Sequence, residues 1–427
     1  MIIFYFLILV LPLTQHHLWA QFVGDMTGIK YIGFACLPYA VLRLVGRRQA
    51  PSFFGTWQAR LFVALCLLST LSYLTMGTGK WYVSHWLTYV SLLLLFFITL
   101  VLVDTLDRLR WVLLTASASL AVASLYVLRD WQTYHAMYKD YRPGWVVGDP
   151  NYFTVNVLLF LPPTFLMMQK STSRWERWFC LGCFVVTLFG VMVSASRGGF
   201  LGMVAGSLYL ILRTKRRFRN LALIGISLAI AMLASPVSPL QRFKNPSRGD
   251  QQSADTHVSL MYGGLRMMLT HPVFGVGIDN FKRNSRLFVT RDEAAQMDNQ
   301  SRVAHNSYVE IGAEMGIPGL LLFVGLLFCS FTSLGKVARM SQRWGVPLVH
   351  EAAVGLQAGF VGSSVAIFFV SGEYQKMFWL ALFLTMCLPP LALEAKKRQS
   401  QLRRRIDVPQ PSKPLGRLET VAVSPLA

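Results

Sequence analysis

Charged residues are scarce in this chain of 427 residues, and acidic residues are the scarcest of them. Only 14% of the residues are charged, with 20 Asp and Glu against 41 Lys and Arg, whereas 54% are hydrophobic. The mean hydropathy is +0.45. Soluble domains contain about 25% charged residues. The composition therefore excludes a soluble globular protein and indicates an integral membrane protein.

Cysteine is also rare, with six residues in the chain. All six fall inside apolar runs, so we interpret them as small packing residues and not as a disulfide framework. Cys180 and Cys183 have the spacing of a redox motif, but they lie within one apolar run. We expect no metal site and no cofactor, because no outer cluster of carboxylates suits a divalent ion.

Long apolar runs, by contrast, occur throughout the chain. A helix needs about 20 mainly apolar residues to cross the hydrocarbon core of a membrane. The first run lacks preceding basic residues and a clear cleavage site, so we expect it to be retained as a helix. The sequence predicts an all-α polytopic membrane protein of about 12 transmembrane helices, at Ile2–Trp19, Ile29–Val45, Leu61–Met76, Trp86–Val103, Trp111–Leu128, Tyr152–Met168, Trp178–Val193, Phe200–Leu212, Leu221–Ala234, Ser307–Leu334, Ala352–Val370 and Phe378–Leu393.

Basic residues gather in alternate loops between these runs, as they do on the cytoplasmic side of membrane proteins. Both termini are therefore expected to be cytoplasmic. The short loops on the opposite, outer side hold few basic residues, namely Lys30, Lys80, Arg197 and Lys376. The net charge of +21 is explained by contacts with anionic membrane lipids. It does not argue for a nucleic-acid partner.

We expect one transmembrane domain over residues 1–393, with two longer outer segments at 129–151 and 236–306. The second lies between predicted helices 9 and 10. Within it, Val258–Thr270 places apolar residues at helical spacing and predicts a helix at the outer membrane interface. Residues 394–427 are basic and rich in proline towards the end, so we expect a disordered cytoplasmic tail.

Two arginines are candidates for an anion site. Arg197 lies in the tight outer turn Ser194–Gly199, where flanking glycines let backbone amides approach a ligand. An arginine at a membrane surface needs a partner, which favours an anion site. The alternative is an interfacial arginine whose guanidinium extends into the surrounding water. Arg266, on the predicted interfacial helix, would offer a planar guanidinium to phosphate oxygens. A lipid-headgroup contact explains it about as well.

His305 is the candidate for proton transfer. It directly precedes Asn306 and Ser307, which are plausible caps for a membrane helix that carries Glu310 and Glu314. Near neutral pH, an imidazole can take a proton from a sugar hydroxyl. Cationic neighbours would disfavour the imidazolium and keep the ring neutral. A histidine whose polar atoms are satisfied at the interface remains the alternative.

Taken together, these segments resemble the O-antigen ligase and O-antigen polymerase superfamily, whose members are bacterial inner-membrane glycosyltransferases of the GT-C type. The resemblance rests on Ser194-x-Ser196-Arg197-Gly198-Gly199, Arg266, His271-Pro-Val-Phe-Gly-Val-Gly277, His305-Asn-Ser-Tyr308, and Glu314-x-Gly316-Ile-Pro-Gly319. Asp149-Pro-Asn151-Tyr152 is also similar to many members. The resemblance covers about Asp149 to Leu334.

The resemblance implies a GT-C-like fold and transfer of a glycan from undecaprenyl pyrophosphate to an acceptor hydroxyl at the periplasmic face. The acceptor would be a lipid A core or another glycan, and the reaction would be metal-independent and inverting. By the same resemblance, Arg197 and Arg266 would bind the pyrophosphate and His305 would be the general base. Supporting roles are possible for Asp149, Asn151, Arg302 and Glu314.

Three functional classes remain open at this point. A ligase and a polymerase would share the donor and the site residues, so the sequence does not separate them. A non-enzymatic transporter of lipid-linked sugars predicts charged residues near the bilayer midplane. The predicted helix interiors contain almost none, which disfavours that class.

Overall fold

The computed structural model describes residues 1–13, 28–47, 51, 53–76, 83–137, 141–144, 149–235, 248–290, 293 and 301–406. Every regular element within these ranges is a helix. Seven of the described helices are long and apolar enough to cross a membrane. The prediction of an all-α polytopic membrane protein is thereby confirmed.

Each of the twelve predicted apolar runs overlaps a helix. These helices are α1 (Ile2–Val10), α3 (Gly28–Val45), α4 (Trp57–Met76), α5 (Val83–Leu102), α6 (Leu106–Tyr134), α7 (Pro150–Lys170), α8 (Arg174–Val193), α9 (Arg197–Arg213), α10 (Arg217–Ala234), α15 (Ser307–Trp344), α16 (Pro347–Ala366) and α17 (Lys376–Ile406). The last six residues of the first predicted run, 14–19, lie outside the described residues, as do parts of both outer segments.

Two helix ends differ from the sequence prediction. Helix α16 stops at Ala366, before the predicted end at Val370, because the chain beyond it turns back onto Ser307: the Ser307 amide donates to the carbonyl of Ile367, and its hydroxyl donates to that of Val370. Helix α17 continues through the predicted disordered tail as far as Ile406. Residues 394–406 are therefore helical, and the tail from 407 onward lies outside the described residues.

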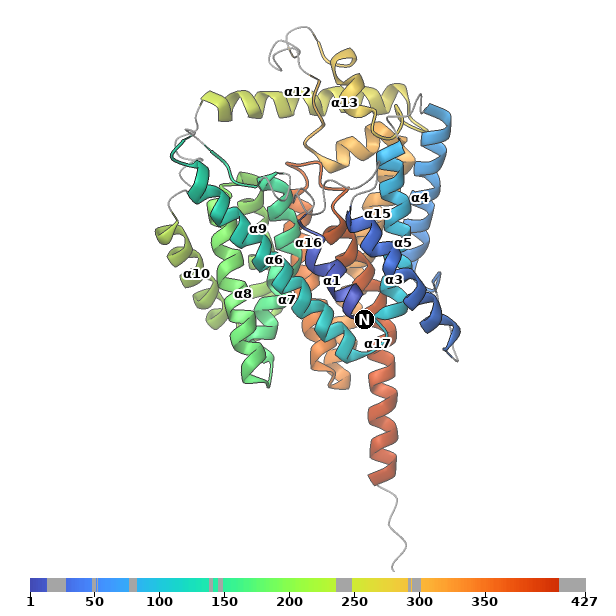
Figure 1. Ribbon diagram of the computed structural model, residues 1–427, viewed down its shortest axis with the longest axis vertical. Helices are drawn as coiled ribbons and strands as arrows, with labels where there is room; N and C mark the ends of the chain where they lie inside the picture. Colours follow the sequence, from blue (N-terminus) through green and yellow to red (C-terminus); the bar gives the residue numbers. More distant parts are fainter. Residues whose placement is uncertain are drawn as a thin grey trace, which may run out of the picture.

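A helix of the second outer segment lies across one end of the bundle. This is α12 (Arg248–Thr270), which is ten residues longer at its start than the predicted Val258–Thr270. Figure 1 shows it running across the tops of the upright helices, with the short α13 (Phe281–Asn284) nearby. We call this the α12 end of the bundle. The free part of α17 extends from the opposite end.

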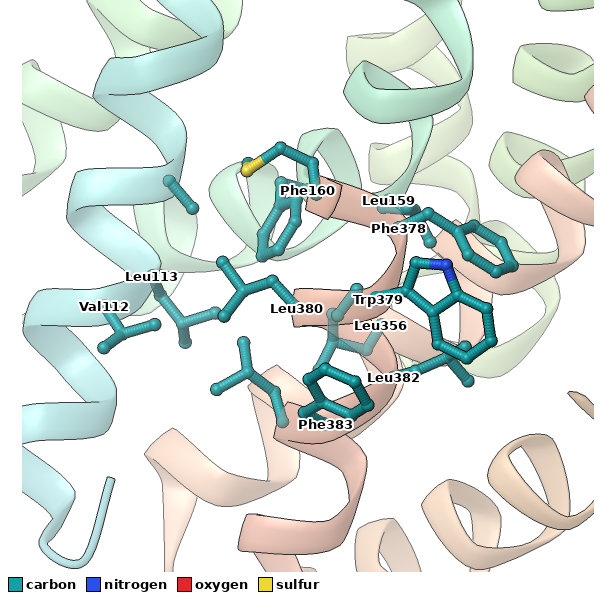
Figure 2. Packing of buried hydrophobic residues seen from close by; sticks show 14 of the residues in the cluster. Val112, Leu113, Leu159, Phe160, Leu356, Phe378, Trp379, Leu380, Leu382 and Phe383 are labelled. Atoms are coloured by element: carbon teal, nitrogen blue, oxygen red, sulfur yellow. The ribbon is translucent and has the colours of Figure 1, made fainter. Parts of the chain in front are cut away.

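The core of the bundle lies where α6, α7, α16 and α17 meet. Figure 2 shows Val112 and Leu113 of α6 facing Phe160 of α7, with Trp379 and Phe383 of α17 beside them. All five side chains are nearly inaccessible to solvent. Ser363 of α16 donates to the carbonyl of Val155, and the Asn156 side chain donates to that of Gln375. The loop that joins α16 and α17 therefore lies near the start of α7 and the candidate site.

Candidate active site

The starts of α7 and α9 are joined by hydrogen bonds. Asp149 caps α7, accepting from the amide of Asn151 at 2.6 Å, and Ser196 caps α9, accepting from the amide of Gly199 at 3.1 Å. The Ser196 hydroxyl also donates to the Asn151 side chain at 2.6 Å. Arg142 donates to the same amide oxygen at 3.1 Å. Two segments that carry the family resemblance therefore form one unit.

The glycines after Arg197 are required by packing. A Cβ at Gly199 would lie 2.4 Å from the hydroxyl of Thr154, and one at Gly198 would lie 2.8 Å from the Cβ of Phe369. These close contacts explain both glycines without a ligand. They bring Arg197, the first residue of α9, against α7 and the loop after α16.

The segment before α15 is held by polar side chains. Asn306 caps the helix, accepting from the amides of Tyr308 and Val309. The carboxylate of Glu310 accepts from the amide of Ala304 at 3.1 Å and from the hydroxyl of Ser371. The residue between these anchors, His305, has φ of 50°, a left-handed conformation that is uncommon for residues other than glycine. The anchors on both sides hold that backbone in place.

About one turn after Glu310, backbone hydrogen bonds connect α15 to the segment Pro272–Val276. We call this contact the joint. Val276 donates to the carbonyl of Ala313 at 2.8 Å, and Ile317 donates to that of Pro272 at 2.9 Å. Gly316 has φ of 71° and interrupts the helix there. A Cβ on it would lie 2.5 Å from the Pro272 carbonyl oxygen. The histidine–proline and glycine–proline motifs of the sequence are thus the two halves of this joint.

Glu314 belongs to the same joint. Its carboxylate accepts from the amide of Phe281 at 3.1 Å and from the hydroxyl of Tyr374 at 2.7 Å. The side chain is buried. In this arrangement, Glu314 ties α15 to the start of α13 and to the loop after α16.

His305 stacks on a second histidine. The ring of His257, from α12, lies 4.8 Å from that of His305 between centroids, with the two planes inclined by 18°. His257 precedes Leu260 and Gly264 by one and two helical turns. Both of these face the protein interior, since Leu260 is fully buried and a Cβ on Gly264 would meet α15. His257 therefore lies on the inner face of α12.

The surroundings lower the pKa of both imidazoles. Burial is the main cause that lowers the pKa of His305; the charge of Arg302 lowers it further, and that of Asp149 opposes the shift. Burial also lowers the pKa of His257, to about 4, with contributions from His305, Arg197, Arg142 and Arg302. The expectation of a neutral His305 agrees with this direction, but desolvation contributes more than the cations.

The structure therefore brings most of the candidate residues together. The charges of Asp149 and Arg302 act on His305, and those of Arg197 and Arg302 act on its stacking partner His257. Asn151 is joined to the start of α9 through Ser196. This neighbourhood combines cations, two imidazoles of lowered pKa and one carboxylate, which suits an anionic group beside a hydroxyl that must lose a proton.

Arg266 occupies a different environment. Its guanidinium makes two hydrogen bonds to Glu293, at 2.7 and 3.2 Å, and a third to the carbonyl of Phe288. The arginine side chain is 41% exposed. The ion pair lowers the pKa of Glu293 and raises that of Arg266. Among the interactions described, none links Arg266 to His305 or Arg197.

Sequence reasoning missed two residues of this neighbourhood. His257 was one of several outer histidines, but its spacing from Leu260 and Gly264 placed it on the apolar face of the predicted helix, and this signal was available. Arg142 lies in the first outer segment, nine residues before Asn151, and no pattern marked it.

Comparison with known proteins supports the resemblance. Residues 182–324 match the family model described as O-antigen ligase. No curated protein matches the chain significantly. The matched range extends from α8 into α15 and contains Arg197, His257, Arg266 and His305. This match supports the resemblance of the chain to the O-antigen ligase and O-antigen polymerase superfamily.

Proposed function

We propose that this membrane protein is a glycosyltransferase that moves a glycan from an undecaprenyl-pyrophosphate donor to an acceptor hydroxyl. The observation that carries the proposal is the stack of His305 on His257, with the charge of Arg302 acting on both rings and that of Arg197 acting on His257. The O-antigen ligase domain supports ligase or polymerase chemistry in general terms.

In the proposed reaction, the acceptor oxygen attacks the anomeric carbon from the face opposite the leaving group, so the configuration inverts. His305 accepts the hydroxyl proton as the new carbon–oxygen bond forms. The bond from the anomeric carbon to the pyrophosphate oxygen breaks, and the electron pair leaves with undecaprenyl pyrophosphate. Arg197, with Arg142 and Arg302 nearby, stabilises the charge on that leaving group. No metal ion takes part in this scheme.

The proposed role of Arg266 needs an exchange of partners. Phosphate oxygens would have to replace the two carboxylate oxygens of Glu293, which now occupy the guanidinium. Bidentate pairing with phosphate uses the same fork of donors. We therefore propose that Arg266 binds the donor pyrophosphate after releasing Glu293.

The acceptor class is proposed from the name of the matched family. A ligase joins a finished glycan to a lipid A core or another surface glycan, at the periplasmic face of the bacterial inner membrane. The alternative is a polymerase, which extends lipid-linked repeat units. A deletion strain separates the two. Long polymer that accumulates on the lipid carrier supports the ligase, whereas single repeat units on the carrier support the polymerase.

A further inference from the structure

Two of the basic residues that the sequence places in short outer loops line a single cavity outside the candidate site. These are Lys30, near the start of α3, and Lys376, the first residue of α17. Their ammonium groups are close enough to interact electrostatically. Two ammonium groups at one end of an apolar cavity can donate charge-assisted hydrogen bonds to an anionic group.

The rest of the cavity is apolar. It has a volume of about 470 Å³ and lies among α1, α3, α5 and the start of α17. Apart from the two lysines and Ser91, the lining residues are Leu, Ile, Val, Phe and Gly. Sites for small molecules have volumes of about 300–1,000 Å³. The cavity therefore has the capacity of a ligand site and the composition of a site for hydrocarbon.

The cavity is elongated along the helices. On α3 its lining runs from Ile29 to Val41, and on α5 from Leu87 to Ile98. These stretches correspond to about 16–18 Å of helix at about 1.5 Å per residue. That is about half of the ~30 Å hydrocarbon core, and hence the depth of one leaflet. Phe34, Val41 and Val90 are each at least 40% exposed, so the groove opens outward.

The charged end of this groove lies at the α12 end of the bundle. Lys376 directly follows the loop that hydrogen-bonds to Ser307 at the start of α15. An anionic lipid in the leaflet at that end would place its phosphate level with the lysines and its acyl chain along the apolar wall.

We propose that the groove among α1, α3 and α5 binds one acyl chain of an anionic phospholipid, with its phosphate between Lys30 and Lys376. An acyl chain matches the depth of one leaflet, whereas an undecaprenyl chain is much longer than the groove. The site is separate from His305 and Arg197, and the proposal does not depend on the proposed reaction.

Native mass spectrometry of the purified full-length protein tests the proposal. The protein is titrated with phosphatidylglycerol, phosphatidylcholine and undecaprenyl phosphate. We expect the wild type to retain phosphatidylglycerol in preference to the other two. The double variant Lys30→Gln/Lys376→Gln should bind it about 30-fold more weakly, since each lysine near an anionic lipid contributes about fivefold, or about 1 kcal/mol.

A matched control removes two positive charges elsewhere. Lys215 and Arg216 are exposed in the turn between α9 and α10, and Lys215→Gln/Arg216→Gln should weaken phosphatidylglycerol binding much less than the double variant in the groove. A second test fills the groove: Val90→Trp should displace the lipid while both lysines remain. Equal retention by the wild type, the lysine variant and the Trp variant would overturn the proposal. Preferred retention of undecaprenyl phosphate would overturn the phospholipid assignment.

Discussion

His305 is held in an uncommon backbone conformation between two anchored neighbours. Ala304 donates to Glu310, and Asn306 caps α15, so the imidazole has a fixed starting point. Its ring then stacks on His257. Strained backbone of this kind is concentrated at functional sites, where the surrounding structure maintains it. The arrangement supports a role for the ring that depends on its position.

The pH dependence of transfer should report the charges around His305. The pKa of His305 is lowered from 6.5, the ordinary pKa of an imidazole. We therefore expect activity to persist below pH 6.5 and to fall when the ring becomes protonated. Removing a cation should raise that pKa, so Arg302→Gln should move the acidic limb of kcat/KM to higher pH. Asp149→Asn, which retains a capping side chain, should move it to lower pH.

These two shifts have opposite signs, which separates them from general damage to the site. The profile is measured as initial transfer rate against pH in reconstituted membranes. Shifts in the same direction for both variants would show that the charges of Arg302 and Asp149 do not act through His305.

His257 should act as a positioning residue. His257→Phe keeps an aromatic ring for stacking, and we expect kcat within a few-fold of the wild type. His257→Ala removes the ring, and kcat should fall about 10-fold or more with little change in KM, because small misplacements of a catalytic group reduce rates strongly. Equal losses for the two variants would indicate that His257 contributes through its nitrogen atoms instead.

At the scale of helices, the motifs around Pro272 and Gly316 form the joint between α15 and the segment after α12. Gly316 and Pro272 approach so closely that no side chain fits between them. The joint lies nine residues after the start of α15 and ties the helix to the segment after α12. The sequence predicted the helices from hydrophobic runs, but it could not predict that these motifs pair, since pairing depends on contacts between residues far apart in the chain.

A comparison of two glycines tests the joint. Gly316 and Gly345 have φ of 71° and 68°, but only Gly316 has neighbouring atoms within 4 Å of an added Cβ. Gly345→Ala should cost about 1–2 kcal/mol through backbone strain alone. Gly316→Ala should cost more and lower the melting temperature further, as measured for both variants in detergent. Similar melting temperatures would show that the close approach is not needed.

The ion pair between Arg266 of α12 and Glu293 determines whether Arg266 is available to bind phosphate. If Arg266 must exchange Glu293 for phosphate, Glu293→Gln should strengthen donor binding, because the amide competes less well than a carboxylate for the guanidinium. Binding of undecaprenyl pyrophosphate to the purified variant measures this. Weaker binding in Glu293→Gln than in the wild type would contradict the proposed exchange.

For the whole molecule, composition and apolar runs were sufficient to predict the fold class and the approximate helix ranges. They did not predict that α17 extends to Ile406, because polar and basic composition alone is typical of a tail. Glu394 and Arg398 form an ion pair one turn apart, and Lys396 lies over the ring of Trp344 at 4.6 Å. These local contacts favour helix over a disordered chain.

The candidate site was predictable in part. His305, Arg197, Asp149 and Asn151 followed from motifs, and the structure places them near one another. The contact of Arg266 with Glu293 was not predictable, since nothing in the sequence pairs residues 27 positions apart in an irregular segment. The site depends on the bundle as a whole, because it combines α7, α9, α12 and α15.

The central claim is that His305 is the base that accepts the acceptor's proton. The most direct measurement compares the wild type with His305→Ala in proteoliposomes that contain the undecaprenyl-pyrophosphate glycan and a lipid A core acceptor. We predict that the variant binds the donor like the wild type but transfers the glycan about 100- to 10,000-fold more slowly, the usual contribution of general-base catalysis. Transfer at the wild-type rate by His305→Ala would contradict the account.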